Sequence, residues 1–277
     1  NGFTAGQELL LGGGIGRVVS LRVFGGIFFH QYNDGKESQE EFNELEDLIV
    51  EPATTPDESE NPTDNIGDET NASEESTEPV DDEIAEALAA LAKYQALYEQ
   101  NEDFVGWIKI DNTLISYPVM QSIDNPDFYL KHAFDKSYSN YGVPYIDEAC
   151  ATGLSNNIII YGHNMSNGSM FADLLKYASQ DYYEAHPVIC FDTLSQLSQY
   201  QIVAVFRFDT NNETFHFNEF TDMNEGEFAE YMYNCHERQL YDTGITAEYG
   251  DELITLSTCE YTYENGRFVV VAKKIIE

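Results

Sequence analysis

Short apolar runs, each bounded by turn-forming residues, dominate the chain from residue 105 onward. Pieces rich in Asn, Gly and Pro, such as IDNPD and TGLSNN, separate them. Runs of this length and composition are typical of β-strands. Because they are many and short and do not alternate with helices, they favour a mainly antiparallel barrel or sandwich. The predicted strands are 105–110, 114–120, 157–161, 187–191, 200–208, 252–259 and 267–276.

A helical pattern precedes these strands. Residues 81–101 begin with acidic residues, which favour a helix N-terminus, and carry apolar side chains at helical spacing. Two further helical segments interrupt the strands, at residues 169–178 and 225–240. We expect one apolar face of the first helix to dock on the strands, and this face consists of Ile84, Leu88, Leu91, Tyr94 and Tyr98.

The N-terminal residues leave two hypotheses open. Residues 9–30 are about as long as a bilayer-spanning helix and contain no acidic residue. Six glycines weaken that interpretation, and so do Arg17 and Arg22, because a charge at the centre of a span costs roughly 2.5–3.5 kcal/mol. Residues 1–33 are therefore either a membrane anchor, with the N-terminus inside the cell, or a leader without a membrane role.

Acidic residues set the electrostatic character of the chain. Residues 51–83 contain 13 of them, with four prolines and no Lys or Arg, so we predict an acidic disordered linker over 34–83 that sets the reach of the domain behind it. The whole chain has 13 basic and 50 acidic residues, a net of −37, which excludes a general nucleic-acid binder. Residues 95–277 alone carry 9 − 28 = −19, so neutral or cationic partners are expected.

Cys259 is the cysteine whose setting suggests chemistry. It ends a predicted strand and opens into a loop, where reactive groups are often displayed. Only seven residues separate it from Arg267, so the two flanking strands form a hairpin that places the guanidinium beside the thiol. The wide spacing of the cysteines excludes a zinc ribbon or a dense disulfide scaffold. Structural roles fit the other three better, namely Cys150, Cys190 and Cys235.

His163 follows another buried strand and precedes small polar residues. An imidazole, with a pKa near ~6.5, can protonate a leaving amine, and an arginine can stabilise an oxyanion. Cys259, His163 and Arg267 therefore form a complete set for acyl transfer, although a free cysteine or a single histidine is often structural. The remaining ligand-type residues lack the tight spacing of a metal site, so we expect no metal and no other cofactor. No comparable setting surrounds His132, His186 or His216.

Several motifs resemble those of the sortases of Gram-positive bacteria, and more narrowly class B. They are TLSTC (255–259), YGHNM (161–165), GRFVVVAKKI (266–275), DFVGWIKIDNTLISYPVMQ (103–121) and DNPDFYLKH (124–132). The resemblance covers about residues 84–277. It implies a mainly β fold in which residues 105–277 form a closed eight-stranded sortase-type barrel and residues 84–104 an N-terminal helix. It also implies a helix between the sixth and seventh strands, for which 225–240 is the candidate.

The same resemblance implies a cysteine transpeptidase. Cys259 would cleave a C-terminal sorting signal of NPxTx type after Thr through a thioacyl intermediate. His163 would act as general acid and base, and Arg267 would hold the substrate and the oxyanion. An amine of a peptidoglycan precursor or a pilin would then accept the secreted protein. The implied location is the extracellular face of the membrane of a Gram-positive bacterium.

Four further residues are implied as contacts of the signal: Ser257, Glu260, Asn125 and Leu130. Ser257 could instead serve strand packing, and Glu260 could be a solvated loop charge. Two other functions stay open. One is a thiol hydrolase that uses the same site with water as acceptor, and the other is a non-catalytic surface adhesin on the same barrel.

Overall fold

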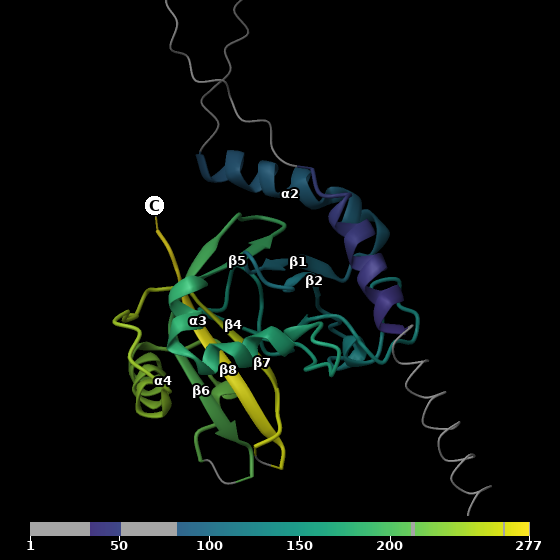
Figure 1. Ribbon diagram of the computed structural model, residues 1–277. Helices are drawn as coiled ribbons and strands as arrows, with labels where there is room; N and C mark the ends of the chain where they lie inside the picture. The colour runs from purple at the N-terminus through teal and green to yellow at the C-terminus, as the bar shows by residue number, and fades with distance from the viewer. Residues whose placement is uncertain (1–33, 51–81, 212–213, 263, 277) are drawn as a thin grey trace, which may run out of the picture.

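Eight strands close into a barrel in the computed structural model, which describes residues 34–50, 82–211, 214–262 and 264–276 (Figure 1). Their order around the barrel is β1-β2-β3-β4-β7-β8-β6-β5. Among the pairs of these strands, only β2/β3 and β4/β7 are parallel, so the barrel is mainly antiparallel. The predicted mainly β, closed eight-stranded barrel is confirmed. The strands are β1 (Phe104–Lys109), β2 (Ser116–Met120), β3 (Tyr145–Ile146), β4 (Asn157–Tyr161), β5 (Val188–Thr193), β6 (Gln199–Asp209), β7 (Leu253–Glu260) and β8 (Gly266–Lys274).

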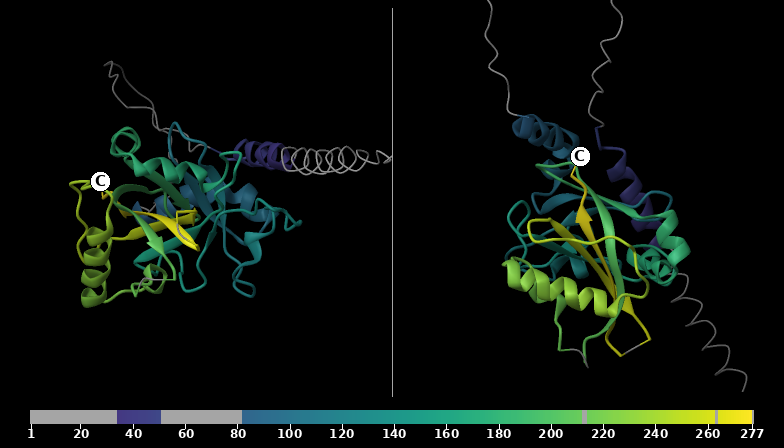
Figure 2. Two further views of the ribbon diagram at one scale, coloured as in Figure 1. Left: turned by 60° about the horizontal axis from the view of Figure 1, so that its bottom comes forward. Right: turned by 90° about the vertical axis from the view of Figure 1, so that its left-hand side faces the viewer.

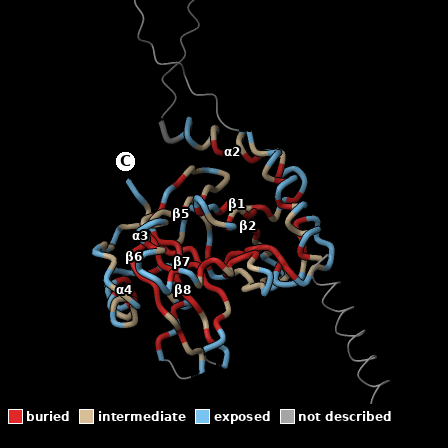
Figure 3. The backbone as a smooth tube through the Cα atoms, viewed as in Figure 1, coloured by how far each residue is buried: buried red, intermediate tan, exposed pale blue. Residues whose placement is uncertain are grey.

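The core lies inside the barrel and under the segments that cover it (Figure 3). Most residues of β4 and β7 are buried, because these central strands are covered on both faces. One buried polar group on β7, Thr255, donates to the side chain of Asn157 on β4 (2.9 Å) and lies 2.6 Å from the hydroxyl of Tyr231. Because this buried hydroxyl has two hydrogen-bond partners, its burial costs little folding free energy, and it joins β7 to β4 and to a surface helix.

Helices surround the barrel (Figure 2). The segment predicted at 225–240 is α4 (Glu225–Arg238), which begins with a capping box between Asn224 and Glu227. The segment predicted at 169–178 is the 3₁₀ helix η2 (Phe171–Ala178). The strand β3, with two residues, and the helix α3, with six, were not predicted, because segments this short have too few positions to show a period. The remaining elements are α2 (Asp82–Gln100), α3 (Gln180–Ala185) and the 3₁₀ helices η1 (Phe128–Leu130) and η3 (Phe217–Glu219).

The face by which α2 docks differs from the predicted one. Ile84 and Leu88 are 54% and 59% exposed, whereas Ala90 and Leu97 are fully buried. Tyr94 belongs both to the predicted docking face and to the observed one, and its hydroxyl donates to Asp192 of β5 (2.6 Å). That polar contact, together with the Lys93–Asp192 ion pair, fixes the rotation of the helix and turns the predicted stripe toward solvent.

The end of α2 agrees with the helical pattern over 81–101 but falls short of residue 104, to which the resemblance extended the N-terminal helix. The helix ends at Gln100 because Asn101 redirects the chain. The Asn101 side-chain oxygen accepts from the backbone N–H of Asp103 (3.0 Å), and its amide donates to the hydroxyl of Tyr129 (2.8 Å). This side chain replaces helical hydrogen bonds, so β1 begins as early as Phe104.

The predicted disordered linker over 34–83 is wrong for its first part. Residues 34–46 form a helix that packs against the barrel. Phe42 and Leu45 are buried, the ring of Phe42 lies 5.1 Å from that of Tyr117, and Glu46 pairs with Lys109 (3.5 Å). Residues 51–81 of the linker and the possible anchor at 1–33 lie outside the described residues. Within the described ranges, no helix has the length and apolar character needed to cross a bilayer.

Candidate active site

The β7–β8 hairpin carries two of the predicted catalytic residues. Its register pairs Cys259 directly with Arg267, as the short loop predicted. The turn uses Asn265 in the left-handed region (φ 66°), which asparagine tolerates. A side chain at Gly266 would place its Cβ 2.6 Å from the carbonyl oxygen of Glu260, so the close approach of the two strands requires glycine there.

The parallel β4–β7 pair brings His163 to the same place. Tyr161 pairs with Ser257, and the chain beyond β4 stays bonded to β7. The hydroxyl of Thr258 donates to the carbonyl of Gly162 (2.7 Å), and the amide of Asn164 donates to the carbonyl of Cys259 (2.9 Å). The residues on either side of His163 are therefore bonded to Cys259 and its neighbour, which fixes the imidazole-bearing backbone relative to the thiol-bearing strand.

Cys259, His163 and Arg267 line one groove of about 560 Å³. The β7–β8 hairpin and the exit of β4 form part of its wall. The segment after β6 contributes Thr210, Phe217 and Asn218, together with His216, for which the sequence had suggested no role. The stretch around η1 contributes Asp127 and Leu130. Three groups from separate parts of the sequence thus face one space that can hold a peptide segment.

The His163 imidazole is oriented by a backbone carbonyl. Its Nε2 lies 2.7 Å from the carbonyl oxygen of Leu130, and since a carbonyl only accepts, Nε2 carries the proton. In the neutral ring Nδ1 then keeps a lone pair that can take a proton. Burial lowers the pKa of His163 below its ordinary value of 6.5, while the hydrogen bond to Leu130 opposes that change.

This pKa direction gives a first prediction. We expect the titration midpoint of His163, followed by NMR of its ring carbons, to fall below 6.5 in the folded protein. The imidazolium that protonates a leaving group is then lost as pH rises through this lowered value, so only a minor protonated population remains at neutral pH. The same resonance measured in concentrated urea, where burial is removed, should titrate at the ordinary value. A folded-state midpoint at or above 6.5 would contradict the prediction.

The guanidinium of Arg267 donates to carbonyls of its own turn. Nη1 lies 3.0 Å from the oxygen of Gly266 and 3.4 Å from that of Asn265. Its positive charge also reaches Tyr145 across the groove, where it opposes the rise in pKa that burial and Asp127 cause in that phenol. The charge of Arg267 therefore acts on the groove, while its Nη1 donates to the carbonyls of the β7–β8 turn.

Two tyrosines in the groove were missed by the sequence reasoning. The hydroxyl of Tyr161 donates to Asp147 (2.7 Å), and that of Tyr145 donates to Asp127 (3.1 Å). Burial raises the pKa of both phenols, so they stay neutral donors. For Tyr161 the available signal was its position at the end of the predicted strand 157–161, two residues before His163. Tyr145 lies in β3, which was not predicted, so no signal marked it.

The four weaker candidates separate into two groups. Ser257 and Leu130 line the groove, and the Ser257 hydroxyl is buried without a hydrogen-bond partner among the described residues. Glu260 and Asn125 are not among the lining residues. The Glu260 side chain is only 8% exposed and pairs with Arg207 (3.6 Å), so it is neither a groove contact nor a solvated charge. Asn125 is exposed, and its carbonyl accepts from Phe128 at the start of η1.

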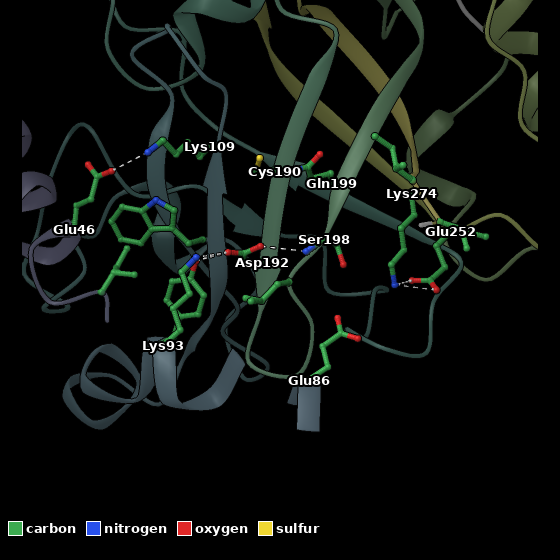
Figure 4. Close-up of a pocket in the computed structure, with 16 residues that line it drawn as sticks. Glu46, Glu86, Lys93, Lys109, Cys190, Asp192, Ser198, Gln199, Glu252 and Lys274 are labelled. Atoms are coloured by element: carbon green, nitrogen blue, oxygen red, sulfur yellow. Dashed lines mark hydrogen bonds and ion pairs between the residues drawn. The ribbon is translucent and has the colours of Figure 1, made fainter. Parts of the chain in front are cut away.

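A larger cavity of about 870 Å³ lies at the opposite end of the β7–β8 hairpin, near Glu252 and Lys274 (Figure 4). It contains the thiol of Cys190, whose pKa is raised by burial, but none of its lining residues is a histidine or an arginine. Its lysines form ion pairs with carboxylates; the pairs are Lys93–Asp192, Lys109–Glu46 and Lys274–Glu252. This cavity therefore lacks the acid and the oxyanion donor that acyl transfer needs.

Comparisons with known proteins agree with this geometry. The sortase domain family matches residues 108–275. Sortase B of Listeria monocytogenes is 35% identical over 203 residues, which are 72% of this chain and 78% of that protein. Sortase B of Staphylococcus aureus is 30% identical over 188 residues, which are 67% and 75% of the two chains.

Solved structures give the same result. The crystal structure of Clostridium perfringens sortase B is 31% identical, has a TM-score of 0.59, and covers 66% of this chain and 99% of its own. A substrate complex of Staphylococcus aureus sortase B has a TM-score of 0.60 at 30% identity, covering 66% of this chain and 84% of its own. This chain belongs to the sortase family, as a cysteine transpeptidase of class B.

Proposed function

We propose that Cys259 cleaves an NPxTx-like sorting signal after Thr and transfers the protein to an amine. The thiolate attacks the carbonyl carbon of Thr, and a sulfur–carbon bond forms while the carbonyl oxygen becomes an oxyanion beside Arg267. The carbon–nitrogen bond then breaks, and His163 gives its proton to the leaving amine. The product of this half-reaction is a thioester of Cys259.

The second half-reaction reverses these roles. An acceptor amine attacks the thioester carbonyl and gives a proton to His163. The sulfur–carbon bond breaks, the thiolate returns, and a new amide joins the two molecules. The cycle closes without a metal or other cofactor in this scheme, because His163 regains from the acceptor amine the proton that it gave to the leaving amine, and Cys259 returns to the thiolate.

One observation carries the proposal: Cys259, His163 and Arg267 line a single groove. Strand pairing fixes Cys259 beside Arg267, and hydrogen bonds of the residues flanking His163 hold it next to β7. An amine acceptor is further supported by a sortase B structure, 30% identical to this chain with a TM-score of 0.60, that was solved in complex with triglycine. We further propose that the acceptor is a peptidoglycan precursor or a pilin, and that the enzyme works at the extracellular face of a Gram-positive membrane.

Mass spectrometry of the full chain with an NPxTx peptide library tests the proposal. We expect cleavage after Thr, and with added triglycine a product that carries the triglycine on the Thr carbonyl. Cys259→Ala should give neither product, and Cys190→Ala, which changes the thiol of the larger cavity, should retain both. Hydrolysed peptide without capture by triglycine or hydroxylamine would instead indicate a thiol hydrolase. Absence of any cleavage or adduct across the library would refute the proposed signal.

A further inference from the structure

The turn that precedes Arg267 is bonded to the chain that leaves β6. The hydroxyl of Thr210 donates to the carbonyl of Asn265 (2.9 Å), and the amide of Asn211 donates to the carbonyl of Glu264 (2.6 Å). The end of β6 and this turn lie side by side at one end of the barrel (Figures 1 and 2). Two segments more than 50 residues apart are thereby joined at the wall of the groove, which Thr210 itself lines and Asn211 does not.

Arg267 uses one of the same acceptors. Its Nη1 donates to the carbonyl of Asn265, to which Thr210 also donates. A carbonyl oxygen has two lone pairs, so both bonds can coexist. The main chain of Arg267 has little freedom, because it pairs with Cys259 on β7 and with Phe208 on β6. What can change during a reaction cycle is therefore the side chain and the turn whose carbonyls hold it.

We propose that Thr210 and Asn211 are positioning residues for Arg267, an inference that rests on the oxyanion role proposed above. When the guanidinium moves from its own turn to a substrate oxyanion, it gives up the Asn265 carbonyl. Thr210 keeps that carbonyl bonded, so the departure leaves no unsatisfied acceptor. Asn211 holds the neighbouring peptide, so the turn does not follow the guanidinium or block the groove.

Two features separate this role from a general contribution to folding. Thr210 is half-buried and Asn211 is exposed, so neither belongs to the core. Glu264 and Asn265, whose carbonyls accept these bonds, are exposed as well, so the bonds fix the position of the turn more than they stabilise the fold. Loss of either side-chain donor should therefore loosen the turn and Arg267 while leaving the barrel intact.

The test compares Thr210→Val, Thr210→Ser and Asn211→Ala in the full chain. With the sorting peptide and triglycine, we expect kcat to fall about 3- to 10-fold in Thr210→Val and Asn211→Ala at unchanged KM, because the lost interaction acts in the transition state. Thr210→Ser keeps the donor and should restore kcat to within about twofold. Thr193→Val is the matched control, since the Thr193 hydroxyl holds the β5–β6 turn and lies outside the groove.

A second readout needs no substrate. The heteronuclear NOE of the Arg267 side-chain Nε–Hε group should fall in Thr210→Val and Asn211→Ala and recover in Thr210→Ser. If the wild type fails to cleave any peptide, the proposed function fails, yet this NOE still tests the positioning. Unchanged kcat and NOE in both variants would overturn the inference. A rise in KM at constant kcat in Thr210→Val would also overturn it, because Thr210 would then contact the peptide directly.

Discussion

Replacing His163 with glutamine is expected to lower kcat/KM by roughly 10²–10⁴-fold, the usual size of a general acid–base contribution. The glutamine amide can still donate to the carbonyl of Leu130, which preserves the bond that orients the side chain. It cannot carry a transferable proton at neutral pH, so the amine would leave without one. Steady-state kinetics with the sorting peptide measures this loss, and thermal unfolding shows whether the fold is retained.

The kind of leaving group separates proton donation from other effects of this substitution. A depsipeptide with an ester in place of the scissile amide has a better leaving group, so the loss in His163→Gln should shrink by at least about tenfold. His186→Gln is the matched control, because the His186 ring also bonds a backbone carbonyl, that of Tyr182, but lies outside the groove. An equal loss on amide and ester substrates would argue against His163 as the acid.

Replacing Arg267 with lysine is expected to lower kcat by roughly 10²–10³-fold, as the loss of an oxyanion donor does in other acyl-transfer enzymes. Lysine keeps the positive charge but loses the planar fork of directed N–H groups. Because pairing with β7 and β6 fixes the main chain of residue 267, a backbone movement cannot bring the lysine ammonium closer to the oxyanion. Kinetics on the amide and on the ester should show the same loss, because an oxyanion forms on both.

Arg238→Lys provides the control for this change. Arg238 lies on α4, where its guanidinium donates to the carbonyl of Asn234 (3.1 Å), and it does not line the groove. Its replacement should leave kcat within about twofold, the range of a surface substitution. A loss smaller than about tenfold in Arg267→Lys would mean that charge alone suffices and that the directed donors are not used.

The relation between Cys259 and Arg267 could be predicted because it is local. A short loop leaves few registers for a hairpin, and the observed register pairs the two residues. The position of His163 is different, since it depends on a parallel pair between strands about 100 residues apart, fixed by contacts such as that of Thr255 with Asn157. No spacing in the sequence encodes that pairing, and here only the family resemblance anticipated it.

The helix over residues 34–46 shows a limit of periodicity. Its buried side chains are mainly Phe42 and Leu45, one turn apart in an otherwise acidic stretch. Two apolar positions are too few to distinguish a docked helix from a solvated segment. On α2 the opposite error arose, because the larger apolar side chains are exposed and small Ala90 faces the barrel. In both cases the surface of the barrel, and not the pattern of the helix alone, decided which side chains are buried.

Docking of the helix over residues 34–46 changes what residues 51–81 can contribute to the tethering of the domain. Val50 donates its N–H to the carbonyl of Lys93 on α2 (3.1 Å), so the chain is attached to the domain on both sides of residues 51–81. A stretch whose two ends are both attached to one rigid body adds nothing to the distance over which that body can be tethered. The number of residues between 50 and 82 therefore does not set the reach of the groove, contrary to the prediction for the linker over 34–83.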